Sequence, residues 1–152
     1  MPISVVKTPK GLVAEGKFVR STKLTRAWNL YYTHGNGPWT DRTQLLHVHI
    51  TSLQEFWKVL ELEKQPSELG PNEDYFFFRQ GSMPTWEHHS NIGGGRLTIW
   101  MRPGLPQSTF NECWKLIQHV LTGEKFLQDT DKICGATACR RTWRNKVRLL
   151  YT

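Results

Sequence analysis

The stretch LLHVHITSLQEFWKVL, residues 45–60, changes from the repeat of a β-strand to the repeat of an α-helix. In its first part, apolar residues alternate with others, which is the pattern of a half-buried strand. Ser52 followed by Glu55 forms a capping box, so a helix is expected to begin there. Apolar residues then recur at helical spacing, at Leu53, Phe56, Trp57 and Leu60. A strand followed directly by an amphipathic helix indicates a fold that mixes both elements.

The rest of the chain repeats this combination. Strand patterns occupy residues 28–32, 75–79, 96–101, 133–140 and 146–151. A second capping box, Thr109 with Glu112, predicts another amphipathic helix that ends at Gly123. Short strands with hairpin-length links favour antiparallel pairing, with helices on one face of the sheet. We therefore predict an α+β domain whose other sheet face is free to carry a ligand.

Length and composition point to one domain that binds nucleic acid. The chain has 152 residues, a formal net charge of +7, a sequence pI near 9.5 and seven tryptophans. Positive charge attracts polyanions, and aromatic rings beside positive charge suit a nucleotide site, although a single tryptophan is more often core. Residues 1–22 lack periodicity and are predicted to be a flexible N-terminal arm, with the domain at residues 23–152. Three cysteines and the lack of a membrane-spanning run indicate an intracellular protein with reduced thiols.

The sequence lacks the motifs of common enzymes. It has no nucleophile elbow, no P-loop and no zinc-protease helix motif. The glycine run at residues 93–95 opens a strand, so it lacks the helix N-terminus that cradles phosphate. His47 and His49 point the same way, but no third or fourth ligand accompanies them. We predict no catalytic residue, no metal site and no cofactor.

The segment MPTWE, residues 83–87, carries the most specific chemistry. The ring of Trp86 can stack on guanine while the Glu87 carboxylate accepts hydrogen bonds from its edge. Trp39, in another loop, would close a sandwich, and methylation makes guanine cationic, which favours π faces on both sides. Basic residues near the end of the chain suit phosphates: Arg140, Arg141, Arg144 and Lys146. The alternative is that both tryptophans are core residues and the arginines form a solvated face.

An ordered set of short motifs resembles the eukaryotic translation initiation factor 4E family, whose members bind the mRNA cap. The set runs from about Lys23 to Tyr151. It comprises Trp28-Asn29-Leu30-Tyr31-Tyr32, Trp39, Gln54-Glu55-Phe56-Trp57, Asp74-Tyr75, Pro84-Thr85-Trp86-Glu87, Gly94-Gly95-Arg96, Trp114, Gly123-Glu124-x-Phe126 and Cys134-Gly135-Ala136.

The resemblance implies a curved antiparallel sheet with helices on its convex face and the cap on its concave face. The 7-methylguanine would lie between two tryptophans, and basic side chains would hold the phosphates. The implied residues are Trp39, Trp86 and Glu87 for the base, and Arg96, Arg141 and Lys146 for the phosphates. Leu150 stands where the family usually has a third tryptophan near the methyl group.

The resemblance also implies a protein-binding surface on the helices. Trp57 would receive a helix from a scaffold or inhibitory protein, although its spacing fits core packing too. The predicted surface consists of Leu53, Trp57, Lys115 and His119. Because Lys115 and His119 replace leucines that are usual in the family, this surface is expected to be more polar.

The predicted function is recognition of capped mRNA, which is delivered to translation initiation or withheld from it. The expected compartment is the cytoplasm, with the nucleus as a second one. Two alternatives are an adaptor that has lost cap affinity and a general single-stranded RNA binder. Glu87 argues against the general binder, because a carboxylate repels phosphate. The chain ends at Thr152, where family members continue, so we expect a shortened form or a divergent paralogue.

Overall fold

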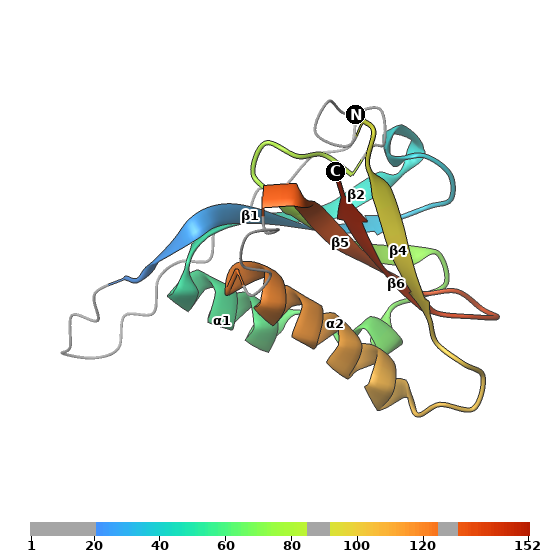
Figure 1. Cartoon of the computed structure of the whole chain (residues 1–152). Helices are drawn as coiled ribbons and strands as arrows, with labels where there is room; N and C mark the ends of the chain where they lie inside the picture. Colours follow the sequence, from blue (N-terminus) through green and yellow to red (C-terminus); the bar gives the residue numbers. More distant parts are fainter. Residues whose placement is uncertain (1–20, 85–91, 125–130) are drawn as a thin grey trace.

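Six antiparallel strands form one curved sheet in the order β2-β1-β3-β5-β6-β4, and two helices cover one of its faces (Figure 1). The computed structural model describes residues 21–84, 92–124 and 131–152. The strands are β1 Lys23–His34, β2 Thr43–Ser52, β3 Glu73–Arg79, β4 Gly95–Trp100, β5 Ile133–Cys139 and β6 Lys146–Tyr151. The helices are α1 Leu53–Leu62 and α2 Gln107–Thr122, with short 3-10 turns η1 Trp39–Asp41 and η2 Pro66–Glu68. The predicted α+β class and the predicted strands are confirmed.

The core lies between the helices and one face of the sheet. Directly paired residues of antiparallel strands point to the same side, so alternate positions build this core. The predicted apolar face of β2 is confirmed, because Val48 and Ile50 are buried in this core, and Trp28 and Leu30 of β1 are buried beside them. The ring of Trp28 stacks on Phe77 of β3 with ring centroids 5.1 Å apart. Other members from α1 and α2 are Phe56, Val59, Phe110, Trp114 and Leu121.

The two helices begin in different ways. The predicted capping box at α1 is confirmed, since the Glu55 backbone N–H donates to Ser52 Oγ and the Glu55 carboxylate accepts from the Ser52 backbone N–H. The predicted capping box of Thr109 and Glu112 is wrong. Helix α2 begins three residues earlier, with Pro106 at the N-cap, and the ring of Pro106 supplies no side-chain cap. Gly123 ends α2 as predicted.

Residues 1–20, most of the predicted arm, lie outside the described part of the chain. Thr22 belongs to the ordered part, because its carbonyl accepts a hydrogen bond from the Leu53 N–H and its own N–H donates to Gln54. No helix within the described ranges is both long and apolar enough to cross a lipid bilayer.

Glu63 makes the packing of the two helices sensitive to pH. Its carboxylate lies at the end of α1, where Gln118 of α2 donates a hydrogen bond over 3.2 Å. Burial raises the pKa of Glu63 from its ordinary 4.5 to about 8, although the Gln118 bond and the Lys115 charge act in the opposite direction. The folded state therefore favours the protonated acid, and ionisation at higher pH opposes folding.

The free energy of unfolding is expected to fall by about 1–2 kcal/mol as pH rises from 4.5 to 8, because the folded state binds the Glu63 proton more tightly than the unfolded state does. The partial solvent contact of Glu63 keeps this value below that of a wholly buried acid. Urea unfolding of the wild type and of Glu63→Gln at pH 5 and pH 9 measures the effect. The Gln variant should lose that part of the pH dependence, whereas Glu61→Gln, an exposed neighbour on α1, should keep it. Equal pH dependence in Glu63→Gln and the wild type would contradict the assignment.

Candidate functional site

The sheet face that the helices leave uncovered, here called the open face, carries those predicted cap-binding residues that lie within the described part of the chain. Strand registers place its side chains in rows. One row crosses five strands through Tyr31, Phe76, Thr137, Arg148 and Thr98. Neighbouring rows place Asp74 beside Cys139, Lys146 and Trp100, and Leu150 beside Arg96. The open face is therefore aromatic over β1 and β3 and cationic over β6 and β4.

Trp39 belongs to the aromatic part of the open face. The η1 turn places its ring edge-on to Tyr31 at 4.9 Å and to Phe76 at 5.1 Å, measured between ring centroids. The side chain is 8% exposed and packs with Phe78 and Leu150 in a second apolar cluster. In this packing it offers a base little ring surface. Stacking on Trp39 thus requires the indole to leave the cluster, and this role stays a prediction.

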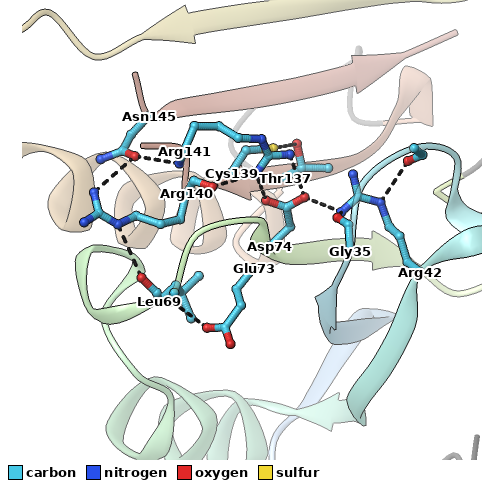
Figure 2. Close-up of polar contacts among 12 residues, drawn as sticks. Gly35, Arg42, Leu69, Glu73, Asp74, Thr137, Cys139, Arg140, Arg141 and Asn145 are labelled. Atoms are coloured by element: carbon cyan, nitrogen blue, oxygen red, sulfur yellow. Dashed lines mark hydrogen bonds and ion pairs between the residues drawn. The ribbon is translucent and has the colours of Figure 1, made fainter. Parts of the chain in front are cut away.

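Asp74 is the polar centre of the site (Figure 2), although the sequence analysis named it only within the Asp74-Tyr75 motif and gave it no role. It has no solvent exposure, and both of its carboxylate oxygens are used. Arg141 binds it through two nitrogens, with Nη1 to Oδ1 at 2.5 Å and Nη2 to Oδ2 at 3.0 Å. Arg42 forms a second ion pair with Oδ2 and also donates to the carbonyls of Gly35 and Gly37. One carboxylate thus orients two arginines at the floor of the face.

The predicted phosphate residues lie close enough to repel one another. Burial lowers the pKa of Lys146, and the charges of Arg148 and Arg141 lower it further. Burial also lowers the pKa of Arg148, with further lowering from Arg96 and Arg141. Among the described residues, Nε of Arg148 is buried and makes no hydrogen bond. An anion here would relieve the repulsion and accept a bond from that nitrogen.

Arg148 is the functional candidate that the sequence reasoning missed. It stands two positions after Lys146 on β6, so the period of a strand places both on the same face. That spacing is a local signal which the sequence does contain. The roles of Arg42 and Asp74 depend on contacts between distant segments, which no local pattern predicts.

Trp86 and Glu87, the predicted base-binding pair, belong to residues 85–91, which lie outside the described part of the chain. His47 and His49 do share one side of β2, since each ring contacts Oδ1 of Asn29 at 2.9 Å. In the described ranges no three His, Cys, Asp or Glu side chains gather in a way that suits a metal ion.

The predicted partner residues lie together on the outer side of the helices. Trp57 is 52% exposed, so the alternative that it is a core residue is wrong. Its ring centroid lies 5.3 Å from that of His119 on α2, and His119 in turn hydrogen-bonds the carbonyl of Lys115. Leu53 and Leu116 are exposed too. The surface therefore combines apolar side chains with the more polar residues expected from the sequence.

Comparison with known proteins identifies relatives of this chain. The model of the eukaryotic initiation factor 4E family matches residues 23–151. Eukaryotic translation initiation factor 4E-1 of Caenorhabditis elegans is 33% identical over 114 residues, which are 74% of this chain and 53% of that protein. Isoform 4E of Prunus domestica is 30% identical over 144 residues, covering 90% of this chain and 65% of that protein. The chain thus spans between half and two thirds of these relatives.

Solved structures with the same fold extend the comparison. Ascaris suum eIF4E-3, in complex with an m7G cap, has a TM-score of 0.79 at 25% identity, covering 86% of this chain and 73% of that one. Caenorhabditis elegans eIF4E-3, in complex with the 4E-binding protein Mextli, has the same TM-score at 24% identity, covering 86% and 75%. Because the family model covers nearly all of the described residues, this chain belongs to the eukaryotic initiation factor 4E family.

Proposed function

We propose that this chain binds the 7-methylguanosine cap of mRNA on its open face and links it, through the helical surface around Trp57, to translation initiation or its repression. The observation that carries the proposal is the cationic cluster of Arg96, Arg141, Lys146 and Arg148 next to the aromatic cluster that contains Trp39. The mRNA cap has a triphosphate, which suits the cationic cluster, and a positively charged methylguanine ring, which suits the aromatic cluster.

The phosphates would lie over β6. Lys146 and Arg148 point to the open face from alternate positions, and Arg141 is held beside them by Asp74. Arg141 uses Nη1 and Nη2 for Asp74, so Lys146 and Arg148 would carry more of the phosphate contact than Arg141. Arg96 lies on the edge strand β4, opposite Leu150 of β6, and would add positive charge from that edge of the sheet.

The base would be held by the predicted pair, with Trp86 stacking on the methylated ring and Glu87 accepting hydrogen bonds from the guanine edge. Trp39 would form the second side of the sandwich after leaving its contacts with Tyr31 and Phe76. Support comes from the Ascaris relative, which was solved with an m7G cap. The protein would be a recognition module without catalytic residues or a cofactor. It would act in the cytoplasm, with the nucleus as a second compartment, and the predicted arm, without Thr22, would lie outside the domain.

Trp86→Ala is expected to weaken binding of 7-methyl-GTP by about 1–3 kcal/mol, because it removes one stacking ring and one π face from a cationic base. Glu87→Gln should also weaken it, since an amide accepts only one of the two bonds from the guanine edge. Tryptophan-fluorescence titration of each protein with 7-methyl-GTP and with GTP measures both the affinity and the preference for the methyl group.

Trp57→Ala is the matched control, because it removes a tryptophan from the opposite side of the molecule. It should leave both affinities unchanged. A wild-type protein that binds neither nucleotide would overturn the cap proposal and favour an adaptor that has lost cap affinity. Equal binding of 7-methyl-GTP and GTP would instead favour a general phosphate or RNA site.

A further inference from the structure

Two tryptophans lie exposed at one end of the open face, and the cap proposal does not use either. Trp143 sits in the turn between β5 and β6 and is 71% exposed, and Trp100 ends β4 with 39% exposure. Their ring centroids are 5.9 Å apart with an angle of 31° between the planes. Large apolar rings at the surface are costly to leave in water, so a paired arrangement of this kind marks a binding surface.

Cations accompany these rings. The guanidinium carbon of Arg144 lies 5.1 Å from the centre of the Trp100 ring, and Lys146 Nζ lies 4.8 Å from it. The surrounding segments, residues 101–106 and 140–146, contain no Asp or Glu but do contain Arg102, Arg140, Arg141, Arg144 and Lys146. Arg141 is paired with Asp74, but these two segments supply no carboxylate of their own to balance the other positive charges. Stacking rings beside such an excess of positive charge match single-stranded RNA, which presents a base and a phosphate at every nucleotide.

The turn that carries Trp143 is held in place. Asn145 Oδ1 accepts from the Arg141 backbone N–H at 3.0 Å, and the Asn145 carbonyl accepts from the Met101 N–H at 3.0 Å. Arg144 Nε also reaches the Met101 carbonyl at 3.4 Å. These bonds tie the turn to the end of β4, so the Trp143 ring is presented from a braced backbone. Preorganisation of this kind reduces the entropy cost of binding.

We propose that Trp143 stacks on the base of the first nucleotide after the cap triphosphate, while Arg144 holds the phosphate that follows. The inference rests on the proposed function, because Lys146 belongs both to the phosphate cluster and to the Trp100 ring contact and so joins the two sites. Trp143 is assigned as the stacking ring because it is the more exposed of the two. The Trp100 ring is already in contact with Arg144 and Lys146. The site thus extends recognition from the cap to the start of the RNA strand.

The test compares two ligands at one salt concentration, 7-methyl-GTP and a capped tetra-adenylate. The wild type is expected to bind the capped tetra-adenylate about tenfold more tightly, the gain from one stacked base. Trp143→Ala should lose most of this preference, keeping only the part from the Arg144 phosphate contact, and leave 7-methyl-GTP affinity unchanged, while Trp143→Tyr should keep most of the preference. Trp57→Ala, a matched exposed tryptophan on the helical side, should keep the full ratio. Thermal melting of each variant establishes that it is folded.

Unchanged preference for the capped tetra-adenylate in Trp143→Ala would overturn the inference and leave the cap proposal intact. If the wild type fails to bind 7-methyl-GTP, the proposed function fails. Binding of tetra-adenylate with a 5′-triphosphate then tests whether Trp143 stacks on RNA. Trp143-dependent binding of that RNA would support the stacking role, and its absence would overturn it. Tighter Trp143-dependent binding of a Glu-rich octapeptide than of RNA would also overturn it, in favour of an acidic protein partner.

Discussion

Replacement of Asp74 by Asn is expected to lower the free energy of unfolding by about 3 kcal/mol, because it removes the charge that two arginines share at a site without solvent exposure. Arg42 and Arg141 would then face each other with no carboxylate between them. Part of the cost is recovered because both guanidinium groups reach some solvent, which places the effect at the low end for broken buried ion pairs.

Urea denaturation measures this effect as a lower midpoint with an unchanged slope. Asp41→Asn is the control, since Asp41 is an exposed carboxylate in the neighbouring η1 turn that accepts a hydrogen bond from the hydroxyl of Thr40. It should change stability by less than about 0.5 kcal/mol. If Asp74→Asn were as stable as Asp41→Asn, the two ion pairs would have no net role in folding.

Trp57→Ala is expected to weaken binding of a helical peptide from a 4E-binding protein by about 2 kcal/mol or more, roughly thirtyfold, because exposed tryptophans at protein interfaces are typical hot spots. The fold should tolerate the change. Trp57 is half exposed, and its ring contacts are with the core residue Phe56 of α1 and with His119 of α2.

Isothermal titration with the peptide, beside a melting curve, separates the two effects. Trp143→Ala serves as the control, because it removes an exposed tryptophan from the open-face side and should leave peptide affinity unchanged. Retained peptide binding in Trp57→Ala would move the partner surface elsewhere, for example toward Leu116. A large loss of melting temperature would instead assign Trp57 to structural support.

The fold could be predicted from local patterns because its elements follow them closely. The alternation of Leu46, Val48 and Ile50 predicted which face of β2 is buried. Ser52 and Glu55 marked the start of α1, since a capping box is a contact between neighbours in the sequence. At α2 the same reasoning gave the wrong start, because proline begins a helix through its backbone geometry and leaves Thr109 inside the first turn.

The site was harder to predict because it depends on contacts across the sheet. The burial of Trp39 against Tyr31 and Phe76, for example, follows from strand pairing and the η1 turn. The pairing of Arg42 with Asp74 joins residues 32 positions apart. Spacing alone could not decide whether Trp57 is exposed or buried. A residue at the edge of the apolar stripe of a helix has the same spacing as a residue in its centre.

The strand order has a consequence for how the chain assembles. Strands β1, β2 and β3 are consecutive in the chain and pair with one another, with β1 in the middle, so they can pair before the later strands are made. Strand β4 comes next in the chain, yet its partner is β6, and the whole of α2 and β5 lies between them. Its backbone N–H and C=O groups must wait for their β6 partners until the β5–β6 hairpin has docked on β3. Closing so long a loop is slow, and an unpaired apolar strand is a target for chaperones during that interval.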